Sequence, residues 1–204
     1  MGKGKNFRVC IISFLVLITL SGCAGTTKFM SEPLGSCNKF EPIPSTEKIS
    51  IKMLRPIAAP TEFSDFAQQT FAKILAEKLK ESQLYSEVNI VSSNDSISTP
   101  LLIEVAIANI GLGRQKRDIG YSSVGVKGEF SVAGRVVDVS KDKILIICEA
   151  SRLSDRDTVP LTSGLFWEGI AITSEKSFIK NLMEWVAEDT VEWFKKLKEG
   201  GGMR

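Results

Sequence analysis

The sequence of 204 residues contains no histidine. Histidine is the commonest general base and the commonest metal ligand among the side chains. Its absence excludes a catalytic triad built on histidine and a zinc site with histidine ligands. The four cysteines lie far apart in the sequence, so none has the Cys-x-x-Cys spacing of a metal site, and we expect no metal and no cofactor.

The sequence also lacks a strong excess of charge of one sign. It has 26 basic and 24 acidic side chains, a net charge of +2. Three of the basic residues and none of the acidic ones lie within residues 1–22, so the remainder carries 23 basic against 24 acidic side chains, a net charge of −1. A nearly neutral chain of this kind does not indicate nucleic-acid binding.

No apolar run is long enough for a comfortable membrane span. The longest is residues 9–20, whose 12 residues would extend about 18 Å as a helix, against a hydrocarbon core of about 30 Å. Basic residues precede the run and small residues follow it, as in a signal peptide. From these residues alone, an ordinary secretory signal or an uncleaved anchor stays open.

The apolar run ends in Leu20-Ser21-Gly22-Cys23, which resembles the lipobox of bacterial lipoproteins. The resemblance implies that the bond between Gly22 and Cys23 is cut, that residues 1–22 are removed as a signal peptide, and that Cys23 becomes lipidated with acyl chains such as palmitate. Two or three long acyl chains hold a protein on a membrane permanently. Because Ala24 follows the cysteine, the resemblance further implies the outer membrane, with the protein facing the periplasm.

The lipidated cysteine begins a segment without hydrophobic periodicity. Residues 23–45 contain three prolines and several glycines and serines, which is typical of a flexible tether. Fully extended, the residues after Cys23 would reach roughly 70 Å. Cys37 in this segment and Cys148 are the two thiols left after processing. They could pair in an oxidising compartment, or Cys148 could be a small buried residue of a strand; the spacing does not decide between these alternatives.

Residues 46–198 are typical of one α+β domain, and residues 199–204 of a disordered tail. We expect a mixed or antiparallel sheet of four to five strands packed with two amphipathic helices. Apolar residues at three- and four-residue spacing predict helices at 61–82, with Thr61 as N-cap, and at 174–198. The phenylalanines of the first helix indicate a core-facing stripe. Alternating apolar residues predict strands at 49–55, 84–91, 101–110, 128–139 and 143–150.

Residues 111–127 are rich in glycine and interrupt this pattern. Gly111-Leu112-Gly113-Arg114 superficially suggests a phosphate-binding loop, but no Lys-Ser/Thr pair follows and no helix is expected after it. We therefore expect a mobile loop. Its charged and aromatic residues are either solvated or contact anionic head groups, a glycan or a partner protein; this candidate contact loop comprises Arg114, Lys116, Arg117 and Tyr121.

The domain also resembles uncharacterised periplasmic lipoprotein domains that are similar to the curli-secretion lipoprotein and to the outer-membrane activators of peptidoglycan synthases. The resemblance is carried by the strand at 49–55, the helix at 61–82, the hairpin at 132–146 and the closing helix at 174–198. The hairpin turn departs from the usual Asp-x-x-x-Gly pattern. Such a resemblance implies an accessory or assembly role without catalysis.

These observations favour a non-enzymatic cell-envelope lipoprotein that is held by a membrane lipid anchor and binds envelope proteins. The alternative is an auxiliary lipoprotein that binds lipid or glycan for an envelope transport system, which requires an apolar cavity or groove. A hydrolase would need a nucleophile beside a base, and the sequence places no such pair. The oligomeric state is left open.

Overall fold

We describe the fold from a computed structural model of the chain. It describes residues 27–30, 32–57, 62–92, 95–119, 121–160 and 167–199, and side chains within 32–57, 62–92, 95–113, 127–154 and 175–199. The predicted signal peptide with its cleavage site at Gly22 and Cys23, the predicted N-cap Thr61, and residues 200–204 lie outside the described residues.

The described residues form one mixed sheet with two helices, which confirms the α+β class. Seven strands occupy six positions across the sheet, in the order β1-β7-β6-β5-β3-β4, with β2 also paired to β7. β3 is parallel to β4 and β5, and the other pairs are antiparallel. The strands are β1 (Thr27–Met30), β2 (Leu34–Lys39), β3 (Lys48–Met53), β4 (Glu87–Val91), β5 (Leu101–Ile119), β6 (Tyr121–Asp138) and β7 (Lys143–Pro160).

The expected count of four to five strands was wrong because the segment predicted as a tether contains β1 and β2. Both pair antiparallel with the outer edge of β7, one after the other. The residues of β2 are mostly exposed. Its pairing uses backbone groups, so the strand leaves no apolar alternation in the sequence by which it could be recognised.

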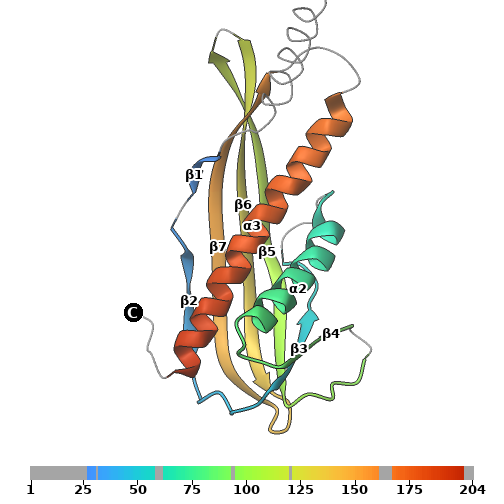
Figure 1. Cartoon of the computed structure of the whole chain (residues 1–204), viewed down its shortest axis with the longest axis vertical. Helices are drawn as coiled ribbons and strands as arrows, with labels where there is room; N and C mark the ends of the chain where they lie inside the picture. Colours follow the sequence, from blue (N-terminus) through green and yellow to red (C-terminus); the bar gives the residue numbers. More distant parts are fainter. Residues whose placement is uncertain are drawn as a thin grey trace, which may run out of the picture.

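The expected loop at 111–127 was also wrong, because β5 and β6 continue through it as one long hairpin. Pairing runs from Leu101 opposite Asp138 to Ile119 opposite Tyr121. β7 accompanies the hairpin as far as Pro160. We call the far end of these three strands the distal arm; it comprises residues 114–119, 121–126 and 155–160. In Figure 1 the arm extends upward from the part of the sheet that the helices cross.

The helices α2 (Ser64–Glu81) and α3 (Trp167–Lys198) lie on one face of the sheet (Figure 1). α2 begins three residues later than expected and α3 seven residues earlier. The phenylalanine stripe of α2 is core, as expected: Phe71 is fully buried and its ring centroid lies 5.3 Å from that of Phe130 on β6. From α3, Leu182, Met183 and Val186 are fully buried against the same core.

Candidate functional site

The two remaining cysteines meet at the edge of the sheet. Cys37 on β2 lies directly opposite Cys148 on β7, and the two form a disulfide. Cys148 is only 7% exposed and belongs to the core, so it is both a buried strand residue and a bridge partner. The disulfide joins the segment that follows the lipobox to the central part of the domain.

Further contacts fix β2 against α3. Gly35 lies beneath the ring of Trp193 and beside the carbonyl oxygen of Glu149, and its φ of +152° is one that side-chain-bearing residues rarely adopt. A Cβ at this position would lie 2.6 Å from the Trp193 ring. Lys39 Nζ donates a hydrogen bond of 2.7 Å to the carbonyl oxygen of Leu197. The N-terminal edge is therefore a packed part of the fold.

The outer face of the sheet, opposite the helices, exposes large apolar side chains. Successive strand residues point to opposite faces, so the neighbours of the buried residues on β6 and β7 face outward. Ile144, Ile147 and Leu153 are 38%, 40% and 38% exposed. Among them runs a cross-strand ion pair in which Arg135 Nε lies 2.6 Å from Glu104 Oε2.

A shallow depression lies on this outer face. Among the residues that line it are Gly111 and Gly113 of β5, Lys127 and Glu129 of β6, and Leu153 of β7. The two glycines create the hollow because they carry no side chain at positions where the neighbouring strands carry long ones. A Cβ added at Gly113 would meet no atom within 4 Å.

The described core offers no room for a small-molecule ligand. The cavity found between the sheet and the helices has a volume of about 20 Å³ and is lined by side chains such as Phe71, Leu75, Val132 and Phe194. That is space for about one water molecule. A lipid or glycan ligand held by the described residues would have to bind at the surface.

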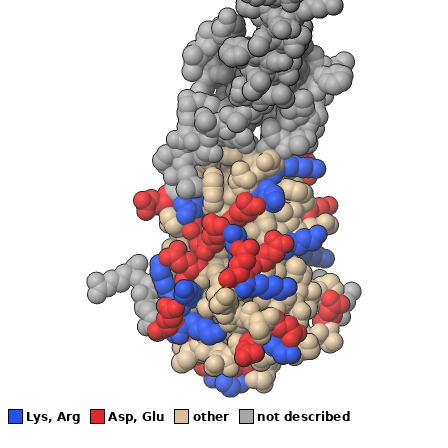
Figure 2. Space-filling model, in the orientation of Figure 1, with Lys and Arg blue, Asp and Glu red and all other residues tan. Residues whose placement is uncertain are grey.

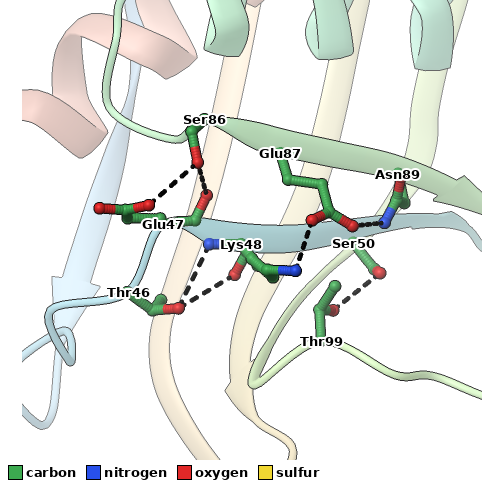
Figure 3. A network of polar contacts seen from close by, with 8 residues as sticks. All are labelled: Thr46, Glu47, Lys48, Ser50, Ser86, Glu87, Asn89 and Thr99. Atoms are coloured by element: carbon green, nitrogen blue, oxygen red, sulfur yellow. Dashed lines mark hydrogen bonds and ion pairs between the residues drawn. The ribbon is translucent and has the colours of Figure 1, made fainter.

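A polar network joins the starts of β3, β4 and β5 (Figure 3). Lys48 Nζ lies 2.7 Å from Glu87 Oε2, and Asn89 donates to Glu87 Oε1. The hydrogen bond and charge of Glu87 raise the pKa of Lys48, and Lys48 in turn lowers the pKa of Glu87. Lys48 therefore stays protonated near neutral pH and cannot serve as a general base.

The hydroxyls of this network are likewise satisfied without an activating base. The Oγ atoms of Ser50 and Thr99 are hydrogen-bonded at 2.7 Å in a buried position, and a neutral hydroxyl does not remove a proton from its partner. Ser86 donates to the backbone and side chain of Glu47 (Figure 3). The network thus connects strands. Within the described part of the chain, no group of three or more potential metal ligands occurs.

A nearly buried ion pair joins the sheet to α3. Arg152 on β7 donates two hydrogen bonds to Asp189, from Nε to Oδ2 at 2.7 Å and from Nη2 to Oδ1 at 2.8 Å. The two side chains are 12% and 9% exposed. The hydrogen bond that Arg152 donates to Asp189 raises the pKa of Arg152. This pair was not predicted; its one signal in the sequence was an acidic residue, Asp189, next to the apolar stripe of the last helix.

The candidate contact loop lies on the distal arm. Its three basic residues occupy the β5 side of the hairpin, and Tyr121 begins β6 opposite Ile119. Their side chains lie outside the described part of the structure. On the face shown in Figure 2, acidic and basic side chains are interspersed. Neither helix that the structure describes is long and apolar enough to cross a membrane.

No family model matches the chain, and no curated protein matches it. Solved structures give weak matches. The PelC dodecamer from Paraburkholderia phytofirmans is 16% identical, with 76% of this chain and 96% of that chain covered and a TM-score of 0.42. Protein XCC0632 from Xanthomonas campestris is 12% identical, covering 87% and 96%, also with a TM-score of 0.42. Lipoprotein GNA1162 from Neisseria meningitidis is 14% identical, covering 67% and 99%, with a TM-score of 0.33. At this level of likeness, these matches identify neither a family nor a function.

Proposed function

We propose that the protein is a non-enzymatic lipoprotein of the cell envelope. It is anchored in the outer membrane through acyl chains on Cys23, faces the periplasm, and binds a partner protein through the outer face of its sheet. The proposal rests chiefly on that face, where Ile144, Ile147 and Leu153 are all more than a third exposed. Exposed apolar side chains grouped on one face are typical of protein-binding surfaces.

The lipobox supports the anchor, and the state of the polar residues supports a role without catalysis. Lys48 is held as a cation by Glu87, and the buried Ser50 hydroxyl faces another hydroxyl. Neither arrangement supplies the nucleophile and base that hydrolysis requires.

The anchor is tested by replacing the lipidated residue. Cys23→Ser should abolish incorporation of radiolabelled palmitate and leave the chain unprocessed. Cys10→Ser is the matched control, because Cys10 lies in the segment that is removed, and this variant should be labelled and processed normally. Palmitate incorporation into Cys23→Ser would contradict the anchor.

The protein-binding role is tested by photocrosslinking in living cells. A crosslinking amino acid at position 147 or 153, on the outer face, should capture the same envelope protein. The matched control is position 77, an exposed residue of α2 on the opposite side of the sheet, which should not capture it. Ile147→Asp should abolish copurification of that protein without lowering the melting temperature. Equal capture from all three positions would contradict a role for the outer face.

The depression beside Gly111 and Gly113 favours a second function, the binding of a lipid or glycan at the surface. Gly113→Leu would place a side chain into the hollow. If the depression binds such a ligand, this variant should lose ligand carried through purification, as detected by mass spectrometry, and keep its protein partner. An unchanged ligand content would leave protein binding as the function of this face.

A further inference from the structure

The N-terminal edge, which comprises β1 and β2, runs in a definite direction along the sheet. Thr27 pairs with Arg156, which belongs to the distal arm, whereas Lys39 pairs with Ile146 near the opposite end of β7. The chain therefore enters the fold on the side of the distal arm and runs away from it (Figure 1).

Few residues separate Cys23 from this edge. Cys23 lies four residues before Thr27, a distance of at most about 14 Å for an extended chain. The sequence alone led us to expect a tether of roughly 70 Å, from which the domain would hang in any orientation. Because β1 and β2 belong to the sheet, three residues remain between the lipidated position and the fold.

This length decides which end of the molecule is close to the lipid. Arg156 pairs with Val126, and Val126 with Arg114. Beyond this row of three paired residues, β5 continues for five more residues, about 17 Å, to the tip of the hairpin. Cys23 can therefore reach close to the tip. In the other direction, Lys143 is thirteen residues from Arg156 along β7, about 43 Å, and is thus about 30 Å farther than Cys23 can reach.

We propose that the Cys37–Cys148 disulfide keeps the chain between the lipid anchor and the sheet short and thereby holds the distal arm against the anionic head groups of the membrane. This inference rests on the proposed lipidation of Cys23. The hairpin part of the arm carries three basic residues and one acidic residue, a net charge of +2, and the β7 part a net charge of −1. Basic residues close to an anionic membrane surface are attracted to it.

The disulfide matters because edge strands fray readily. β2 is held by its ladder to β7, by the Gly35–Trp193 contact and by the Lys39–Leu197 hydrogen bond. A covalent bridge in the middle of that ladder keeps Cys37 at β7 even when these weaker contacts open, so the chain between Cys23 and the sheet cannot exceed residues 24–36. Without the bridge, release of the edge would lengthen the chain between Cys23 and the sheet from 3 residues to the 24 residues that precede β3, and the arm would no longer be kept near the lipid.

The orientation is tested with the lipidated full-length protein in vesicles of phosphatidylcholine and phosphatidylglycerol. A photocrosslinking amino acid is placed either at position 121, in the arm, or at position 141, in the turn at the other end of the sheet. The yield of lipid adducts should be several-fold higher at position 121. Equal yields, or a higher yield at 141, would overturn the inference.

The role of the disulfide is tested by two changes. The double variant Cys37→Ser/Cys148→Ser should bring the ratio of adduct yields, position 121 to position 141, close to one. Since this variant could also lose stability, a second variant keeps the bridge and inserts about twenty Gly and Ser residues between Ala24 and Thr27, a length that restores the long tether. It should lower the ratio in the same way. An unchanged ratio in this folded variant would overturn the inference that the short chain after Cys23 keeps the arm near the lipid.

The contribution of charge is tested by changing the lipid and the arm. Adduct yield at position 121 should fall in vesicles of phosphatidylcholine alone, and in the triple variant Arg114→Glu/Lys116→Glu/Arg117→Glu. The matched control reverses three exposed helix residues, Lys73, Lys80 and Lys195, to Glu and should not change the yield. Equal yields in both kinds of vesicle would overturn the contact with anionic head groups, as would exclusive crosslinking of position 121 to a protein in cells. Failure of Cys23 to incorporate palmitate would instead overturn the proposed anchor.

Discussion

The two ends of β5 are built from different residues, although both are strands. Residues 101–107 are all buried, with Ile103 and Ile107 at 1% or less exposure under the helices. The continuation at 111–119 contains two glycines and three basic residues, yet the ladder to β6 runs on to Ile119. Apolar residues in the sequence therefore indicate which part of a strand is buried under the helices. Formation of the strand itself requires only a neighbouring strand with free backbone groups.

The covered end should be the more sensitive to substitution, and this difference is largest for its aromatic residues. Phe130→Ala removes a fully buried ring that packs against Phe71 and should lower the free energy of unfolding by about 3–5 kcal/mol. Leu153→Ala, on the outer face and 38% exposed, should cost less than about 1 kcal/mol. Urea unfolding measures both, and similar losses would show that the outer face is covered in solution.

The next largest loss of stability should follow from breaking the ion pair between β7 and α3. Asp189→Ala removes the carboxylate that accepts two hydrogen bonds from Arg152, whose side chain is 12% exposed. We expect a loss of about 3 kcal/mol in unfolding free energy. Glu184→Ala, which removes the more exposed pair with Lys180 on the same helix, should cost less than about 0.5 kcal/mol. A small effect of Asp189→Ala would mean that water screens Arg152.

Two glycines near the border between the covered part and the arm provide a matched pair. A Cβ at Gly128 would collide with the ring of Phe178 and lie 2.9 Å from Leu182, both on α3, so Gly128→Ala should destabilise the fold by about 1–3 kcal/mol. Gly113→Ala finds open space and should leave stability unchanged or raise it by up to about 1 kcal/mol. Thermal unfolding of the two variants compares the helix-covered face of the sheet with its outer face at nearly the same position along the strands.

The smallest expected effect concerns the turn at the covered end. Asp138 accepts hydrogen bonds from the hydroxyl and backbone of Ser140 and from the backbone of Lys141. These bonds, that of the Ser140 side chain above all, lower the pKa of Asp138 below its ordinary value of 3.8.

A carboxylate with a lowered pKa stabilises the fold above its ordinary pKa and ceases to do so as the pH falls through the lowered value. Asp138→Asn should therefore be less stable than the natural protein near neutral pH, and the difference should shrink as the pH falls below the ordinary pKa of 3.8. Urea unfolding at a series of pH values measures it. A difference that stays constant with pH would assign the effect to packing of the turn.

The sequence predicted the elements whose pattern is local. Both helices, the β3 strand and the covered parts of β5, β6 and β7 were expected, because their apolar residues repeat at the spacing of the element. The starts of both helices were misplaced, that of α2 by three residues and that of α3 by seven. The N-terminal edge and the arm were missed because polar and glycine-rich strands leave no such repeat. Asp189 was missed as a site because its partner, Arg152, lies on a different element, beyond the strand that was expected at 143–150.

By itself, the sequence determined that no histidine chemistry is available, that two amphipathic helices pack on a sheet, and that residues 20–23 before the domain resemble a lipobox. Composition, periodicity and short motifs are properties of neighbouring residues, so they can be read without the fold. Only the tertiary structure decided that Cys37 and Cys148 pair across 111 positions and that the supposed tether is the edge of the sheet. Strand pairing depends on which free edge is within reach once the core has formed, and that is settled by packing between distant parts of the chain.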